Sequence, residues 1–409
     1  MKPNQSSPAA LRRLTSELRI AVIRQRYNPY GGAERFVERA LGALVREGAE
    51  VTLITRSWEG APQDGFRLKI CDPGYSRILG GRAARDRSFT ACAQEEIANG
   101  AYDIVQAHER IPGCMIFRAG DGVHAAWLEH RARGQSAFAR MSAKLSPFHR
   151  YILKQEVAML ASPALQAVIC NSVLVREEMR RYYDVPADKL VVIENGVDLE
   201  SFHPRLAAQW REQQRQALGI EPDTPLFLYV GSGFERKGVP QLLAAFARMK
   251  SAQAQLIIVG QDRQQAVFER QSTALGLAQR VRFAGPQKDV RPFYGMADAF
   301  VLPTRYDPMP NAALEAMACG LPIITSTTCG IAARVSDGQN GFVCDALDVS
   351  TLAAQLDHLA APGVAAAMRP AARAAVADLD LEAMAGKLVA LYHRLLTKLA
   401  EKNTDPLEQ

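Results

Sequence analysis

Two basic residues, Arg236 and Lys237, follow the apolar run FLYVG and precede an amphipathic helical pattern. Ligands of open α/β sheets bind at the carboxyl ends of strands, and helix starts attract anions. Fixed cations at this place could hold a diphosphate and stabilise the negative charge that develops when a sugar–phosphate bond breaks. An exposed Arg-Lys pair at a helix start is also common without any ligand. The dipeptide therefore predicts a phosphate site only together with its position after a strand.

The segment YDPMPNAALEAMACGLPIIT carries a carboxylate in unusual surroundings. Glu315 is the only charged residue between Asp307 and Arg334, and it lies within an Ala/Leu/Met helical pattern. A carboxylate in such a place costs free energy unless hydrogen-bond donors surround it. The paired hydroxyls of a ribose would supply two donors, so Glu315 is predicted to bind a nucleotide.

The same helix is predicted to start after Pro308 and Pro310, with the amides of Asn311, Ala312 and Ala313 pointing outward. Such a helix start is a natural anion site. Asp307 lies in the preceding loop, where it could accept bonds from sugar hydroxyls. The alternative for Asp307 is a carboxylate that caps the helix.

The first half of the chain offers weaker candidates at predicted strand ends. Gly31 and Gly32 follow the strand RIAVIRQ and permit close backbone approach to a ligand, although they do not form a three-glycine dinucleotide motif. His108 follows IVQA, and Asp121 and His124 follow MIFRAG. A lone histidine is more often structural than catalytic, so either histidine could be a satisfied core residue.

A basic segment runs from residue 131 to residue 155 without any Asp or Glu, and aromatic and aliphatic residues interrupt it. This composition predicts contact with an anionic membrane surface or a phosphorylated acceptor, and a solvated basic helix is the alternative. Its six cations are Arg131, Arg133, Arg140, Lys144, Arg150 and Lys154.

Composition sets the broad class. The 409 residues are 48% hydrophobic with a net charge of +6, which is typical of a globular protein of more than one domain with a mild preference for anions. Seven scattered cysteines without a zinc-like spacing favour a reduced, cytosolic protein and no metal site. No apolar run resembles a signal peptide or a membrane span.

Short β-branched runs alternate with longer helical patterns from residue 19 onward, which predicts two series of βαβ units. A segment from about Pro204 to Pro225, rich in Gln, Arg and Pro, separates the series. We expect a tail at 1–18, a Rossmann-like acceptor domain at 19–203, a second Rossmann-like nucleotide-sugar domain at 204–380, and at 381–409 a helix, packing back towards the first domain, and a tail. The cleft between the domains is the expected site.

The stretches VGSGFERKGVPQLLAAF, IIVGQDR, ENGVDLESFHP and VRFAGPQKDVRPFYGMADAFVLPTRYDPMPNAALEAMACGLPIITS resemble family 4 retaining glycosyltransferases of the GT-B fold. The resemblance implies that Arg236 and Lys237 bind the donor diphosphate. It also implies that Asp307 and Glu315 correspond to the E-x7-E motif, with the first Glu shortened to Asp. Many members place a histidine where this chain has Gly120 and Asp121, so a catalytic role passes to Asp121, with His124 as the alternative.

RYNPYGGAERF, TRSWEG and GSGFERKGV further resemble members that transfer glucose from UDP-glucose to a heptose of the lipopolysaccharide inner core. The resemblance implies a metal-independent hexosyltransferase without a cofactor, acting on a lipid-linked glycan at the inner face of the inner membrane, and no binding of nucleic acid. A nucleotide-sugar epimerase on the same fold and a non-catalytic binder of anionic glycans or membranes are the alternatives.

Overall fold

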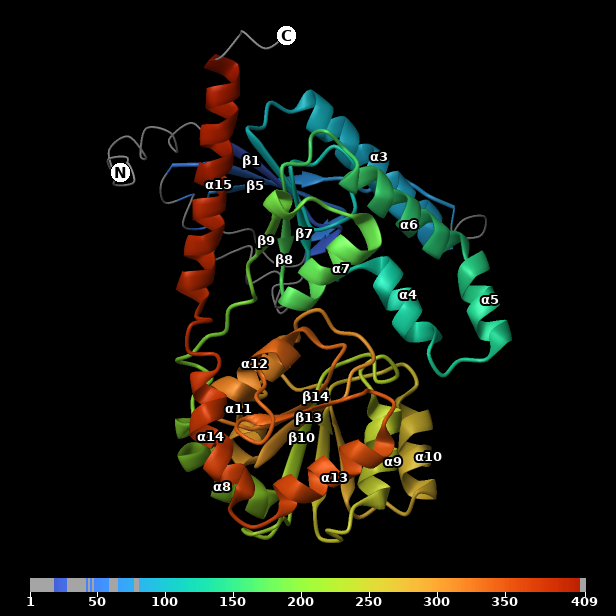
Figure 1. Ribbon diagram of the computed structural model, residues 1–409, viewed down its shortest axis with the longest axis vertical. Helices are drawn as coiled ribbons and strands as arrows, with labels where there is room; N and C mark the ends of the chain where they lie inside the picture. Colours follow the sequence, from blue (N-terminus) through green and yellow to red (C-terminus); the bar gives the residue numbers. More distant parts are fainter. Residues whose placement is uncertain are drawn as a thin grey trace.

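A computed structural model describes residues 18–27, 42, 45, 48–58, 65–76 and 81–404. Two α/β units lie one above the other, and the chain crosses between them twice (Figure 1). Gly31 and Gly32, predicted to approach the ligand, lie outside the described residues.

The first unit is built on a parallel sheet of seven strands in the order β5-β3-β1-β6-β7-β8-β9. Its apolar runs are short and β-branched, which suits strands that are buried on both faces. The strands are β1 (Arg19–Ile23), β3 (Glu50–Thr55), β5 (Phe66–Ile70), β6 (Ile104–Ala107), β7 (Ile116–Ala119), β8 (Ala167–Cys170) and β9 (Leu190–Val192). The short strands β2 (Arg26–Tyr27) and β4 (Ser57–Trp58) pair beside it.

The second unit has a parallel sheet of six strands in the order β12-β11-β10-β13-β14-β15. Numbered from β10, this is the order 3-2-1-4-5-6 of a Rossmann sheet, which reverses between β10 and β13. The strands are β10 (Leu226–Val230), β11 (Gln255–Val259), β12 (Val281–Gly285), β13 (Ala299–Leu302), β14 (Ile323–Ser326) and β15 (Gly341–Cys344). Loops at this reversal are where a ligand is expected.

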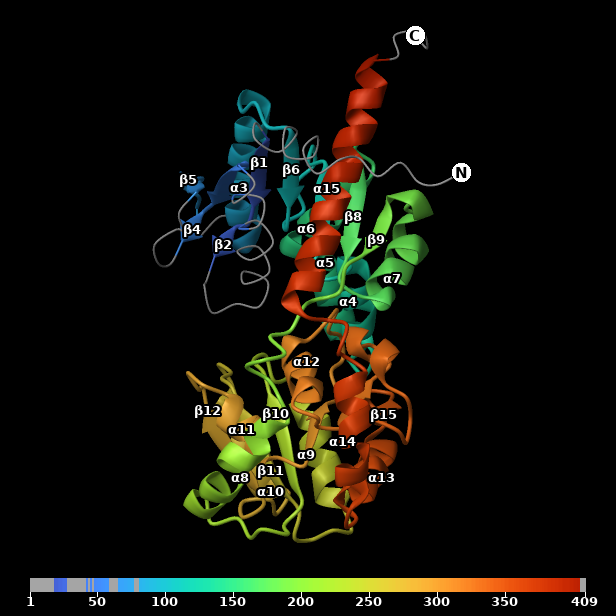
Figure 2. The same cartoon turned by 90° about the vertical axis from the view of Figure 1, so that its left-hand side faces the viewer.

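Helices cover the faces of both sheets (Figures 1 and 2). In the first unit they are α3 (Gly81–Asn99), α4 (His124–Ala132), α5 (Ala137–Leu145), α6 (Pro147–Leu160) and α7 (Val173–Tyr183). In the second they are α8 (Arg205–Ala217), α9 (Val239–Arg248), α10 (Gln265–Ala274), α11 (Arg291–Met296), α12 (Asn311–Ala318), α13 (Val349–Ala360) and α14 (Val364–Ala374). The separating segment after Pro204 thus forms α8, which packs on the second unit through Arg215 and its ion pair with Asp298 at 2.8 Å.

The last helix, α15 (Leu381–Thr404), returns to the first unit and runs along it (Figure 2). Leu388 and Tyr392 on this helix are fully buried and share a core cluster with Ile20 and Ile104 of the first sheet. Burial of apolar side chains at this contact stabilises the return of the chain.

The expectation that all cysteines are reduced is wrong for one pair. Cys71, just after β5, and Cys92, in α3, form a disulfide with their Cα atoms 5.9 Å apart. The sequence separation of 21 residues carries no recognisable spacing, so only the packing of α3 on the edge of the sheet brings the two thiols together. The other five cysteines are buried and unpaired.

Candidate donor-binding site

The loop after β10 is held rigidly by its own backbone and by the next loop. The Lys237 amide donates to the Gly233 carbonyl at 3.0 Å, and the Asp262 carboxylate accepts from the Phe234 amide at 2.8 Å. Gly238 closes the loop with φ +81°, and a Cβ there would lie 1.9 Å from the Pro303 carbonyl oxygen. Only glycine fits this position, because any side chain would meet the backbone that follows β13.

This loop brings its two cations to the Asp307 carboxylate. Lys237 Nζ lies 3.2 Å and Arg236 Nη1 lies 3.6 Å from Asp307 Oδ2. Asp307 is buried, and Arg236 keeps 37% of its side chain exposed. Two cations thus face one carboxylate at the reversal of the sheet, which is the place where a ligand of such a sheet is expected.

The start of α12 lies beside this cluster, and Asn195 orients it. Asn195 Nδ2 donates to Asn311 Oδ1 at 2.9 Å and to the Met309 carbonyl at 3.1 Å. Pro310 precedes the helix, and Asn311 and Ala312 at its first turn are partly exposed. The start of α12 therefore presents the positive end of a helix dipole on the same side of the sheet as Arg236.

Glu315 lies one turn further along α12, half-buried between buried neighbours. The Tyr294 hydroxyl donates to Glu315 Oε2 at 3.0 Å. Burial and the adjacent Glu315 carboxylate raise the pKa of Tyr294 well above its ordinary value, so Tyr294 remains a donor. The Tyr294 hydroxyl thus supplies one of the hydrogen-bond donors that Glu315 was predicted to find in a ligand. Nothing in the local sequence links Tyr294 to Glu315.

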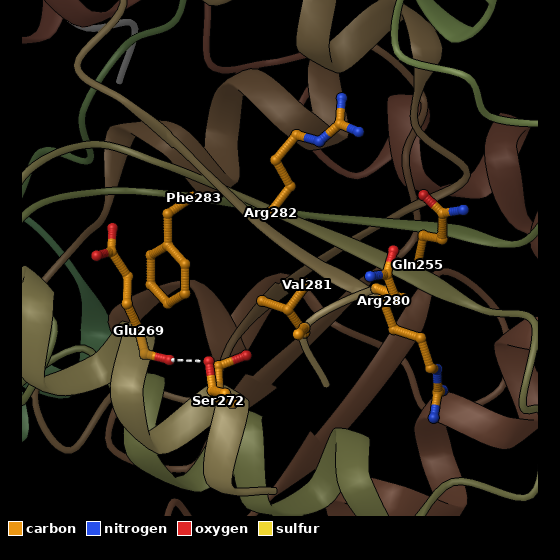
Figure 3. Close-up of a pocket in the computed structure, with 10 residues that line it drawn as sticks. Gln255, Glu269, Ser272, Arg280, Val281, Arg282 and Phe283 are labelled. Atoms are coloured by element: carbon orange, nitrogen blue, oxygen red, sulfur yellow. Dashed lines mark hydrogen bonds between the residues drawn. The ribbon is translucent and has the colours of Figure 1, made fainter. Parts of the chain in front are cut away.

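An open groove of about 900 Å³ adjoins the loop after β10. It is lined by residues that follow β10 and β11: Ser232, Gly233, Gln261, Asp262, Arg263 and Gln264. A second cavity of about 340 Å³ lies between α10 and the edge strand β12, with Ser272 and Phe283 among its walls (Figure 3). That cavity includes Gln255 at the start of β11, so it lies away from the carboxyl ends where the candidate residues gather.

In the first unit, Asp121 and His124 sit in different environments. Asp121 is exposed in the loop between β7 and α4. His124 is buried, and its Nε2 lies 3.1 Å from His149 Nδ1. Burial, with the charge of Arg110 and the neighbouring His149, lowers the pKa of His124 to about 3. The imidazole of His124 is therefore neutral at ordinary pH.

His108 is also buried, after β6, with its Nε2 3.0 Å from Gln106 Nε2. Burial and the positive charges of Arg118 and Arg24 lower its pKa well below the ordinary value. Tyr392 of α15 donates to Gln106 Oε1 at 2.9 Å. His108 thus belongs to a buried polar network, whereas Asp121 reaches solvent.

A buried carboxylate that sequence reasoning missed fixes the loop around Asp121. Glu156 is fully buried and accepts from Arg110 Nε at 2.8 Å, from the Tyr183 hydroxyl at 2.6 Å and from the His124 amide at 3.1 Å. A buried charge persists only when it is paired and hydrogen-bonded in this way. Glu156 directly follows the basic segment that ends at residue 155, and nothing in the local sequence indicates that it is buried.

The basic segment is not one amphipathic helix. It covers the end of α4, all of α5 and the start of α6, with Ser146 ending α5 and capping α6. Arg133 pairs with Asp345 of the second unit at 2.7 Å, and Arg131 Nη1 lies 3.3 Å from His149 Nε2. The four remaining predicted cations are exposed: Arg140, Lys144, Arg150 and Lys154.

Two family models match consecutive parts of the chain. The one described as Glycosyltransferase Family 4 matches residues 30–201, and the one described as Glycosyl transferases group 1 matches residues 211–374. The lipopolysaccharide glucosyltransferase WaaG of Escherichia coli (strain K12) is 26% identical over 327 residues, 79% of this chain and 84% of the relative. A D-inositol 3-phosphate glycosyltransferase of Xylanimonas cellulosilytica is 28% identical over 392 residues, 87% and 92% of the two chains.

Solved structures share the arrangement of the two units. The crystal structure of WaaG has a TM-score of 0.78 at 24% identity and covers 91% of this chain and 99% of its own. HepE from Anabaena, in complex with UDP-glucose, has a TM-score of 0.67 at 20% identity, covering 92% and 100%. These likenesses confirm the predicted GT-B fold. With both units matched, the chain belongs to the family 4 glycosyltransferases, retaining enzymes of that fold.

Membrane-spanning helices and metal-binding clusters are both absent from the part of the chain that the structure describes. Among the described residues, no helix is long and apolar enough to cross a membrane. The same residues hold no group of three or more His, Cys, Asp or Glu that could bind a metal ion.

Proposed function

We propose that this glycosyltransferase moves glucose from UDP-glucose to a lipopolysaccharide core or a related lipid-linked glycan, without a metal ion. The observation that carries the proposal is the contact of Arg236 and Lys237 with Asp307 at the reversal of the second sheet. WaaG, named for transfer of glucose to lipopolysaccharide, and HepE, solved with UDP-glucose, support the donor and the acceptor class.

In this proposal the second unit binds the donor. Arg236 and Lys237 bind the diphosphate together with the helix start at Asn311 and Ala312, and Glu315 accepts from the ribose hydroxyls. When the bond between the anomeric carbon and the phosphate oxygen breaks, negative charge grows on the departing UDP. The two fixed cations stabilise that charge and lower the barrier.

The acceptor hydroxyl attacks from the face that UDP leaves, so the configuration at the anomeric carbon is retained. Asp307 faces the transferred sugar, and Asp121 faces the cleft from the first unit. Between the two first-unit candidates, the exposure of Asp121 and the buried, neutral state of His124 favour Asp121.

The exposed face of α5 is proposed to dock on the inner face of the inner membrane. Phe138, Met141 and Leu145 on this helix are 85%, 56% and 64% exposed, and Arg140 and Lys144 flank them. Apolar side chains beside cations suit the boundary of an anionic bilayer, where each contributes to binding. In this proposal the enzyme works in the cytoplasm, bound peripherally to the membrane in which its lipid-linked acceptor is embedded.

The test is UDP release from UDP-glucose in the presence of core-truncated lipopolysaccharide, with the anomeric configuration of the product read by NMR. The proposal expects acceptor-dependent release and a retained configuration. Turnover of the donor without acceptor and with a changed sugar would indicate an epimerase instead. No turnover with any nucleotide sugar would leave only a binding function.

A further inference from the structure

Tyr306 belongs to the second unit by sequence but is buried in the first. It lies in the loop between β13 and α12, is 2% exposed, and shares a core cluster with Val123, Val175 and Met179 of the first unit. Its ring stacks on His130 of α4, with centroids 5.6 Å apart and planes inclined by 19°. A large aromatic side chain therefore crosses between the units.

The hydroxyl of Tyr306 makes two hydrogen bonds inside the first unit. It donates to Glu178 Oε2 of α7 at 2.6 Å and accepts from the Val123 amide at 2.9 Å. Burial and the Glu178 carboxylate raise the pKa of Tyr306 well above its ordinary value, so the hydroxyl remains protonated. Val123 directly precedes α4, two residues after Asp121, so this bond holds the loop that carries Asp121.

The backbone of Tyr306 belongs to the donor site. Its carbonyl accepts from Arg236 Nη1 at 2.7 Å, and the next residue is Asp307, which contacts Lys237. The loop of the first unit approaches it closely at Gly122, where φ is +72° and a Cβ would lie 2.2 Å from the Tyr306 hydroxyl. Tyr306 thus contacts both units, through its hydroxyl in the first and through its carbonyl in the second.

We infer that Tyr306 is a positioning residue that holds the Asp121 loop of the first unit in register with Asp307 and the diphosphate cations of the second. The inference rests on the proposed transferase function. If it holds, loss of the hydroxyl leaves donor binding intact but lets the two sides of the cleft shift, and small displacements of reacting groups slow a reaction strongly.

The first variant is Tyr306→Phe, which keeps the ring and removes only the hydroxyl. We expect UDP affinity within about twofold of wild type and kcat lower by about tenfold. The free energy of one buried hydrogen bond corresponds to a change in rate of about that size. Hydrogen exchange at the Val123 amide should become faster. Tyr151→Phe is the matched control, because it removes a buried hydroxyl, bonded to Thr90 at 3.1 Å, away from the cleft.

Glu178 supplies the second pair of variants. Glu178→Gln keeps an acceptor for the hydroxyl and should retain most of kcat, whereas Glu178→Ala should match Tyr306→Phe. When Glu178→Ala is combined with Tyr306→Phe, kcat should fall little below that of either single variant, since the effects of contacting residues that act together are not additive. This comparison also remains informative if one variant folds poorly.

Unchanged kcat and unchanged Val123 exchange in Tyr306→Phe would overturn the inference, as would a loss of UDP affinity equal to the loss of kcat. If wild type transfers no sugar, the proposed function fails. The exchange rate of Val123 still decides separately whether the Tyr306 hydroxyl anchors the loop.

Discussion

At the residue scale, the central feature is one buried carboxylate shared by two cations. Asp307 lies within 3.6 Å of both Arg236 Nη1 and Lys237 Nζ. Lys237 is the more enclosed of the two, with 14% of its side chain exposed, and its stem packs over Gly231. A more enclosed cation acts on a ligand with less screening by water.

Lys237→Met keeps most of the stem and removes the charge. If Lys237 stabilises the departing diphosphate, kcat/KM for UDP-glucose falls by about 100-fold, the usual size of one such electrostatic contribution. Steady-state UDP release measures this. Lys250→Met, on the surface beyond α9, is the control and should behave as wild type. A rise in KM alone, with kcat unchanged, would mean that Lys237 binds the donor without assisting departure.

His124 predicts how stability depends on pH. Its pKa is about 3 in the folded protein and near 6.5 in an unfolded chain, so between these values the unfolded state binds more protons. The free energy of unfolding should therefore fall as pH drops from 7 to 5. Urea unfolding at the two pH values measures it. In His124→Gln the pH dependence should be weaker, and an unchanged dependence would show that other groups cause it.

Among the elements, helix α5 leaves its apolar side chains uncovered. Its apolar side chains point to solvent, with Phe138 85% exposed, while none of its residues is buried. A short helix of this kind gains little from its own hydrogen bonds and needs a surface to cover its apolar face.

Charge reversal of α5 tests whether its partner is an anionic membrane. Arg140→Glu with Lys144→Glu should abolish flotation with vesicles that contain anionic lipid, because each cation near such a surface contributes about 1 kcal/mol. Arg270→Glu with Lys398→Glu changes the net charge equally on other exposed helices and should leave flotation unchanged. Equal losses in both double variants would attribute binding to net charge, and not to α5.

The sequence predicted the elements better than the contacts between them. Alternating apolar runs were enough for two parallel sheets, because each strand carries its own pattern. The contacts of Tyr306 with Glu178 and of Asn195 with Asn311 were missed, since each joins residues more than 100 positions apart that only the docking of the units brings together. Tyr294 beside Glu315 and the Cys71–Cys92 disulfide each join residues 21 positions apart within one unit, and no recognisable spacing signals either contact.

At the scale of the whole molecule, the two units are joined by more than the linker. Arg334 of the second unit pairs with Glu194, where the chain leaves the first, and Arg133 of the first unit pairs with Asp345 of the second. Asn195 also accepts from the buried Arg118 of β7 at 2.8 Å while it orients Asn311. Together with the Tyr306 hydroxyl bond to Val123, these contacts hold the loop that carries Asp121 against the loop that carries Asp307.

In the proposed function, the second unit recognises a nucleoside diphosphate through Arg236 and Lys237. Titration calorimetry of UDP, UMP and uridine against wild type and Lys237→Met tests it directly. We predict that wild type binds UDP most tightly. UMP should bind about tenfold or more weaker, because one charged phosphate group and its hydrogen bonds are lost. In Lys237→Met the ratio of the UDP and UMP affinities should be smaller than in wild type. Equal affinity for UDP and UMP in wild type, or an unchanged difference in Lys237→Met, would contradict the account.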